Sequence, residues 1–203
     1  MVFKKRKSAP ERVLAPTTHY VGANGQSISA GDMKYSADRI ILLTEDQPEI
    51  LQQMVSSVKR AQRTLQGKFG DPEYITQTCA TSSVPEVVDN LGRFREHSPD
   101  ARLYACLDFN MGHNTESGSR RPTEGLWYDS TFQHFLNNGG AVVMYTGFPE
   151  AVQQTEVIMN TKRNYPNVEA VAVAQKSNPQ LPLDRVILGL TMRAMYPSEM
   201  KKR

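Results

Sequence analysis

Five short apolar or β-branched runs recur along the chain, and each is followed by polar residues and then by a segment with helical spacing. The runs are residues 40–43 (IILL), 74–80 (YITQTCA), 101–107 (ARLYACL), 141–145 (AVVMY) and 168–174 (VEAVAVA). Nearly continuous apolar runs of this length are typical of strands buried on both faces. Strands that alternate with helices form a parallel sheet, because each crossover returns the chain to the same edge. The sequence therefore predicts an α/β fold, a doubly wound five-stranded parallel sheet with helices on both faces.

The two ends of the chain depart from this alternation. Residues 1–37 carry prolines, glycines, serines and scattered charge without a sustained period, which predicts a basic and partly mobile N-terminal extension. A chain of 203 residues is long enough for one domain with such extensions. We therefore predict a single α/β domain over residues 38–197 and a basic C-terminal tail over residues 198–203.

The composition narrows the classes of function. The chain is 39% hydrophobic and 22% charged, and its formal charge of +3 is too small to indicate a nucleic-acid partner. No apolar run approaches the roughly 20 residues of a membrane span, and no apolar core follows the basic start, so we expect neither a membrane partner nor a secretory signal. Cys79 and Cys106 lie in predicted strands without the spacing of a zinc site, which favours reduced, buried thiols and a cytoplasmic protein.

Charged and hydroxyl side chains follow four of the five predicted strands. These residues are Glu45 and Asp46 after the first strand, Asp108 after the third, Thr146 after the fourth and Lys176 after the fifth. Open α/β sheets bind ligands outside the carboxyl ends of their strands, so this edge is the candidate site. Three converging carboxylates repel one another unless a cation joins them, and Mg²⁺ suits a site with few carboxylates and a backbone carbonyl.

A carboxylate beside such an ion can act as a nucleophile toward phosphorus and form an acyl phosphate. Lys176 and the metal would offset the charge on the transferring group, and Thr146 could bind its oxygens. Each residue alone also has an ordinary structural interpretation. In that interpretation, Asp108 simply begins a turn, and Glu45 and Asp46 simply complement the dipole of the following helix.

Four segments taken together resemble a response-regulator receiver domain. They are residues 40–48 (IILLTEDQP), 103–111 (LYACLDFNM), 142–147 (VVMYTG) and 173–176 (VAQK). No single segment is specific, but all four occur in the order of the family, each at a predicted strand end. The resemblance spans about residues 38–196 and implies the flavodoxin-like topology of receivers.

The resemblance also implies a role for each site residue. Asp108 corresponds to the phosphoacceptor, and Glu45 and Asp46 correspond to the acidic pair that holds Mg²⁺. Asn110 would lend its backbone carbonyl to the same ion. Thr146 corresponds to the switch hydroxyl, and Lys176 to the partner of the phosphoryl group.

Three features depart from the family pattern. Ser177 follows the lysine where the family usually has a proline, and Val173 stands where the family has its switch aromatic. The loop over residues 112–125 is longer than usual. We therefore expect an atypical receiver whose phosphorylation site is retained and whose readout differs.

These observations favour a stand-alone receiver of a two-component phosphorelay. It would take its phosphoryl group from a histidine kinase or a histidine phosphotransfer protein and signal to a downstream protein, with a homodimer left open. It would not be an enzyme beyond hydrolysis of its own acyl phosphate. The alternatives are a receiver-like interaction module that works without phosphorylation and a phosphatase of the haloacid-dehalogenase type. The latter family usually has a second acid two residues after its nucleophile, where this chain has Asn110.

Overall fold

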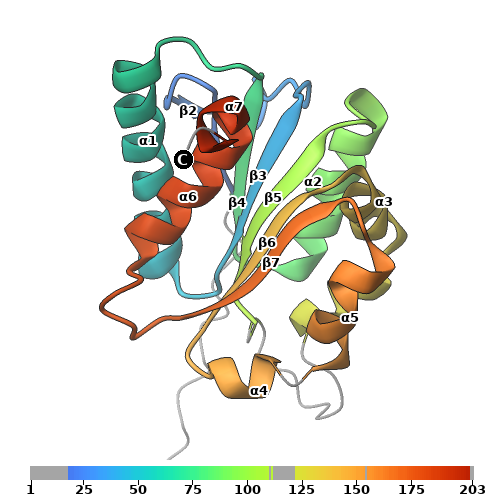
Figure 1. The fold of residues 1–203 in the computed structure, drawn as a ribbon. Coiled ribbons are helices and arrows are strands. Elements are labelled where there is room, and N and C mark those ends of the chain that lie inside the picture. The colour runs from blue at the N-terminus through green and yellow to red at the C-terminus, as the bar shows by residue number, and fades with distance from the viewer. Residues whose placement is uncertain (1–17, 110, 112–121, 154, 202–203) are drawn as a thin grey trace, which may run out of the picture.

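Seven strands form one sheet in the computed structural model, which describes residues 18–109, 111, 122–153 and 155–201 (Figure 1). The strands are β1 (Thr18–Val21), β2 (Ser27–Ile28), β3 (Arg39–Thr44), β4 (Thr76–Thr81), β5 (Arg102–Leu107), β6 (Gly140–Thr146) and β7 (Val168–Gln175). Their order across the sheet is β2-β1-β4-β3-β5-β6-β7. The strands β3 to β7 pair in parallel, whereas β1 is antiparallel to both of its neighbours.

Helices cover both faces of this sheet (Figure 1). They are α1 (Pro48–Phe69), α2 (Val84–His97), the 3₁₀ helix η1 (Pro122–Tyr128), α3 (Ser130–Asn138), α4 (Pro149–Gln153), α5 (Glu156–Asn164), α6 (Leu183–Met195) and α7 (Pro197–Lys201). The helices α1 and α6 pack on one face, and α2, η1, α3 and α5 pack on the other. The predicted α/β fold with helices on both faces is confirmed. None of the helices in the described ranges combines the length and apolar character needed to cross a membrane.

The central strand β3 shows why its apolar run is continuous. All six of its residues are buried. Ile41 and Leu43 belong to the core under α1 and α6, whereas Ile40 and Leu42 belong to the core under α2 and α3. Because successive side chains point to opposite faces, a strand covered on both faces needs apolar residues at every position. Burial of this strand fixes the position of Glu45, the buried acid that directly follows it.

The expected five-stranded sheet is wrong by two strands. Residues 18–28, inside the expected 1–37 extension, form β1 and β2. β1 pairs along the outer edge of β4, from Thr18 opposite Thr81 to Val21 opposite Thr78. The pairing satisfies backbone groups that an uncovered edge would leave to solvent. The four residues of β1 are too few to show a clear strand pattern in the sequence, so its pairing with β4 defines it as a strand.

A buried polar network also holds residues 18–37 against the rest of the protein. The Tyr20 hydroxyl donates to Asn90 Oδ1 of α2 at 2.7 Å and lies 3.1 Å from the Tyr35 hydroxyl. The Arg93 guanidinium donates to the Tyr35 hydroxyl at 3.3 Å. Burial raises the pKa of Tyr20 well above its usual value, with a further contribution from its hydrogen bond to Tyr35. The hydroxyl of Tyr20 is therefore a neutral structural group.

Candidate functional site

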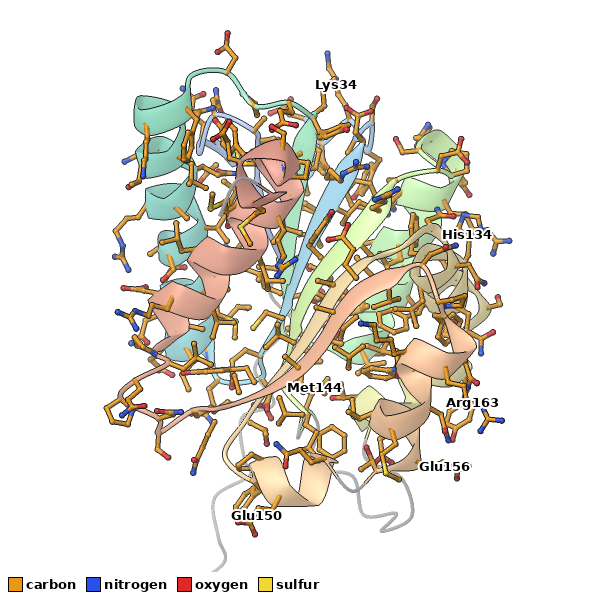
Figure 2. The ribbon with its side chains drawn as sticks, viewed as in Figure 1. Lys34, His134, Met144, Glu150, Glu156 and Arg163 are labelled. Atoms are coloured by element: carbon orange, nitrogen blue, oxygen red, sulfur yellow. The ribbon has the colours of Figure 1, made fainter. Side chains whose placement is uncertain are left out.

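The carboxyl ends of the parallel strands meet at the lower edge of the sheet in Figure 1. The strands β3 and β5 are neighbours, and the backbone N–H of Asp108 donates to the Thr44 carbonyl at 3.0 Å. Met144, labelled in Figure 2, pairs in register with Leu107, the residue before Asp108. Side chains that follow these strands therefore share one edge, the usual ligand position in open α/β sheets.

Three carboxylates come together at this edge. One oxygen each of Glu45, Asp46 and Asp108 lies within 4.8 Å of the other two. Glu45 has 0% of its surface exposed and Asp108 has 2%, whereas Asp46 is exposed. Carboxylates at this separation disfavour each other's ionised form unless a cation lies among them. The cluster therefore has the charge and the oxygen atoms to attract a cation.

Lys176, directly after β7, brings one cation to the two buried acids. Its Nζ lies 2.7 Å from Glu45 Oε2 and 3.3 Å from Asp108 Oδ1. The backbone of Lys176 is held as well, because its N–H donates to the Thr146 carbonyl at 2.8 Å and its carbonyl accepts from the Tyr145 hydroxyl at 3.3 Å. One ammonium offsets only part of the charge that three carboxylates can carry.

Burial and ion pairing shift the pKa values of two groups in this cluster, Glu45 and Lys176. Burial raises the pKa of Glu45 from 4.5 to about 7, and the nearby charge of Asp108 adds to the rise while Lys176 opposes it. Burial lowers the pKa of Lys176, but the ion pairs with Glu45 and Asp108 outweigh that effect and leave its pKa raised. Near neutral pH Lys176 is charged, and a second cation bound among these acids would favour the ionised form of Glu45.

The donor set fits a hard divalent ion. Glu45, Asp46 and Asp108 offer only carboxylate oxygens, which magnesium and calcium both accept. The exposed position of Asp46 leaves space for water ligands, which magnesium usually retains. Asn110, whose carbonyl the resemblance assigns to the same ion, lies outside the described residues.

Thr146 lies at the same edge and is fully buried. Its hydroxyl accepts a hydrogen bond from the backbone N–H of Phe148 at 3.1 Å, which closes the turn after β6. Its carbonyl accepts from Lys176 N–H, so the ends of β6 and β7 are coupled at this point. The hydroxyl is therefore engaged in its own turn in this structure.

Two further threonines touch Asp108, and the sequence analysis did not identify either as a site residue. The Thr44 hydroxyl accepts from the Asp108 backbone N–H at 3.1 Å, and the Thr123 hydroxyl donates to the Asp108 carbonyl at 2.8 Å. Both threonines have 0% of their surface exposed. The position of Thr44 beside the acidic pair could have drawn attention to it. Thr123 has no such signal, because it lies in a separate element, η1, 15 residues after Asp108.

Comparison of the chain with protein-family models, curated proteins and solved structures finds no match. The geometry of this edge is therefore the basis on which a function can be assigned to the protein.

Proposed function

We propose that the chain is a receiver-like phosphoacceptor that takes a phosphoryl group on Asp108 in a two-component phosphorelay. The supporting observation is the convergence of four side chains at one sheet edge. The carboxylate of Asp108 lies beside those of Glu45 and Asp46, with the Lys176 ammonium 3.3 Å away. A nucleophile, a set of metal ligands and a fixed positive charge are the parts that phosphoryl transfer to a carboxylate needs.

The strand order supports the same proposal. The parallel strands run β4-β3-β5-β6-β7 across the sheet. Counted along the chain from β3, this is the order 2-1-3-4-5 of flavodoxin-like folds, in which ligands bind where the order reverses. The reversal lies between β3 and β5, at Glu45 and Asp108. The additional strands β1 and β2 extend the sheet on the far side of β4 and leave this edge unchanged.

The proposed reaction is a single displacement at phosphorus. An oxygen of the Asp108 carboxylate attacks the phosphorus atom, the bond from phosphorus to the donor breaks, and the donor leaves with the electron pair. Lys176 offsets negative charge on the phosphoryl oxygens from its position beside Asp108. Mg²⁺ held by Glu45, Asp46 and Asp108 would supply further charge neutralisation. The Thr146 hydroxyl would bind the phosphoryl group after releasing Phe148 N–H.

The proposed donor is a histidine kinase or phosphotransfer protein, and the proposed output is contact with a downstream protein in the cytoplasm. The helices near β7 carry exposed apolar side chains that suit such a contact. Phe148 beside α4 is 67% exposed, and Met159 on α5 is 63% exposed. The free, buried thiols of Cys79 and Cys106 suit a reducing compartment.

Phosphorylation from a small-molecule donor tests the proposal. The purified protein is treated with acetyl phosphate and Mg²⁺, and its intact mass is measured. We expect one alkali-labile phosphoryl group, lost in Asp108→Asn and kept in Asp89→Asn, which changes an exposed aspartate on α2. Acetate is the leaving group in this assay, so no other protein is needed.

Two other results would contradict the proposal. A wild-type protein that gains no mass and binds no Mg²⁺ would favour a receiver-like interaction module that works without phosphorylation. Steady turnover of an aryl phosphate, abolished by Asp108→Asn, would favour a hydrolase of the haloacid-dehalogenase type.

A further inference from the structure

Two buried hydroxyl groups hold the backbone of Asp108 from opposite sides. On one side, the Asp108 N–H donates to both the carbonyl and the hydroxyl of Thr44, at 3.0 Å and 3.1 Å. On the other side, the Thr123 hydroxyl donates to the Asp108 carbonyl at 2.8 Å. The backbone N–H of Asp108 is thus bound by β3, and its backbone carbonyl is bound by η1.

Asp108 lies just beyond the strand that carries it. The last registered pair between β5 and β6 is Leu107 with Met144, so Asp108 is one residue past this ladder. A residue at the end of a strand can rotate about its backbone dihedrals unless other contacts restrain it. The hydrogen bond from Thr123 is such a restraint, and it holds the peptide group that joins Asp108 to Phe109.

The element that carries Thr123 is itself firmly packed. Leu126 and Trp127 of η1 are buried in the core under α2 and α3. The Trp127 ring packs edge-on against Phe132 of α3, and its Nε1–H donates to the Thr161 hydroxyl of α5 at 2.9 Å. The position of the Thr123 hydroxyl is therefore set by core packing on three helices, and its hydrogen bond transmits that rigidity to Asp108.

We propose that Thr123 is a positioning residue for the phosphoacceptor, an inference that depends on the proposed function. Its hydroxyl keeps the Asp108 carboxylate aligned with Lys176 and with the acids of β3 without touching the phosphoryl group. In-line attack at phosphorus demands such alignment. A displacement of the attacking group by about 1 Å can lower the rate on the order of a hundredfold. Thr44 restrains the same residue from the opposite side.

The test compares the rates of Asp108 phosphorylation by acetyl phosphate at saturating Mg²⁺. Thr123→Val removes the hydroxyl with little change of shape, Thr123→Ser keeps it, and Thr123→Ala is a second variant without it should valine disturb folding. We expect the maximal rate to fall about tenfold or more in the variants without a hydroxyl. The serine variant should stay within about threefold of wild type, and the acetyl phosphate concentration at half-maximal rate should be unchanged in all.

Thr191 provides a matched control. It is fully buried in α6, and its hydroxyl donates to the Ile187 carbonyl at 2.8 Å, the same type and length of bond. Thr191→Val also removes a buried, hydrogen-bonded hydroxyl, and it should leave the phosphorylation rate at the wild-type value whatever its Tm. This comparison separates a loss of positioning from a general loss of stability.

The outcomes distinguish the two proposals. Equal maximal rates for Thr123→Val, Thr191→Val and wild type would overturn the positioning role and leave the phosphoacceptor proposal standing. A serine variant as slow as the valine variant would also overturn it, because the hydroxyl would then not be the cause. A wild-type protein that takes up no phosphoryl group would overturn both.

Discussion

At the scale of the residue, the buried carboxyl group of Glu45 is an acid whose pKa its surroundings raise strongly. It has no exposed surface, and its partner within ion-pair distance is Lys176 at 2.7 Å. Burial penalises its charged form more strongly than this ion pair favours it, so its pKa rises to about 7. The protein without bound metal therefore carries an acid that releases its proton near neutral pH.

The pH dependence of stability follows from this shift. Between pH 4.5 and 7 the unfolded chain ionises Glu45 while the folded protein retains its proton, so the free energy of unfolding falls as pH rises. The expected loss from this group is about 3 kcal/mol. Lys176 does not add to the change, because its raised pKa keeps it charged throughout this interval.

Urea unfolding with a metal chelator, measured at pH 5 and at pH 8, checks this expectation. Glu45→Gln cannot titrate at this position, so its free energy of unfolding should fall by about 2.5 kcal/mol less between these two pH values than that of the wild type. Glu49→Gln, at a charged residue in the first turn of α1, should follow the wild type. Parallel pH profiles for Glu45→Gln and wild type would show that Glu45 ionises normally in the fold.

At the scale of the element, two glycines determine how α3 passes into β6. The helix ends at Asn138, and Gly139 and Gly140 have φ values of 94° and 120°, a region that side chains rarely adopt. A Cβ atom at Gly140 would lie 1.9 Å from the Leu103 carbonyl oxygen of β5. The register between β6 and β7 also shifts at Gly140. This tight connection lies at the amino edge of the sheet, opposite the candidate site.

Gly140→Ala is therefore expected to be strongly destabilising. Positive φ and the clash with the β5 backbone together should lower the free energy of unfolding by about 3 kcal/mol or more. Gly92→Ala is the matched control, because a Cβ atom there meets nothing within 4 Å inside α2. The control should gain up to about 1 kcal/mol from helix propensity. Urea unfolding of both variants measures the difference, and equal stabilities would contradict the close approach of Gly140 to β5.

At the scale of the whole molecule, the parallel sheet brings together residues that are far apart in the chain. Glu45, Asp108 and Lys176 follow three different strands, yet ion pairs at 2.7 Å and 3.3 Å join them. The three acids and the single lysine leave excess negative charge in a largely buried place. A divalent ion that binds the folded protein and not the unfolded chain would stabilise the whole fold.

Magnesium is therefore expected to raise the stability of the protein. At ten times its Kd, the ion should increase the free energy of unfolding by about 1.4 kcal/mol. Asp46→Asn removes an exposed ligand without disturbing the core, so this increment should shrink, whereas Asp89→Asn should keep it. Thermal unfolding with and without Mg²⁺ measures the effect. A Tm that does not respond to Mg²⁺ in the wild type would argue against the metal site.

Much of the architecture can be predicted from local patterns of apolar and polar residues. The apolar runs of β3, β5 and β6 indicate strands covered on both faces, since such runs are stable only in a doubly covered sheet. The polar residues that end these strands were therefore predictable as neighbours at one edge. The order of Glu45, Asp108 and Lys176 in the sequence was sufficient to suggest the site because strand direction is the same in every parallel βαβ unit.

The tertiary structure decided what depends on contacts between distant residues. β1 exists because β4 offers it an open edge, and the raised pKa of Glu45 exists because the surrounding elements exclude water from it. The hydrogen bond of Thr123 to Asp108 depends on how η1 packs on the core. The sequence alone therefore determined the fold class and the candidate acids, since short-range periodicity encodes them. Burial, ion pairing and the restraint on Asp108 were decided by packing, since these are properties of neighbours in space and not along the chain.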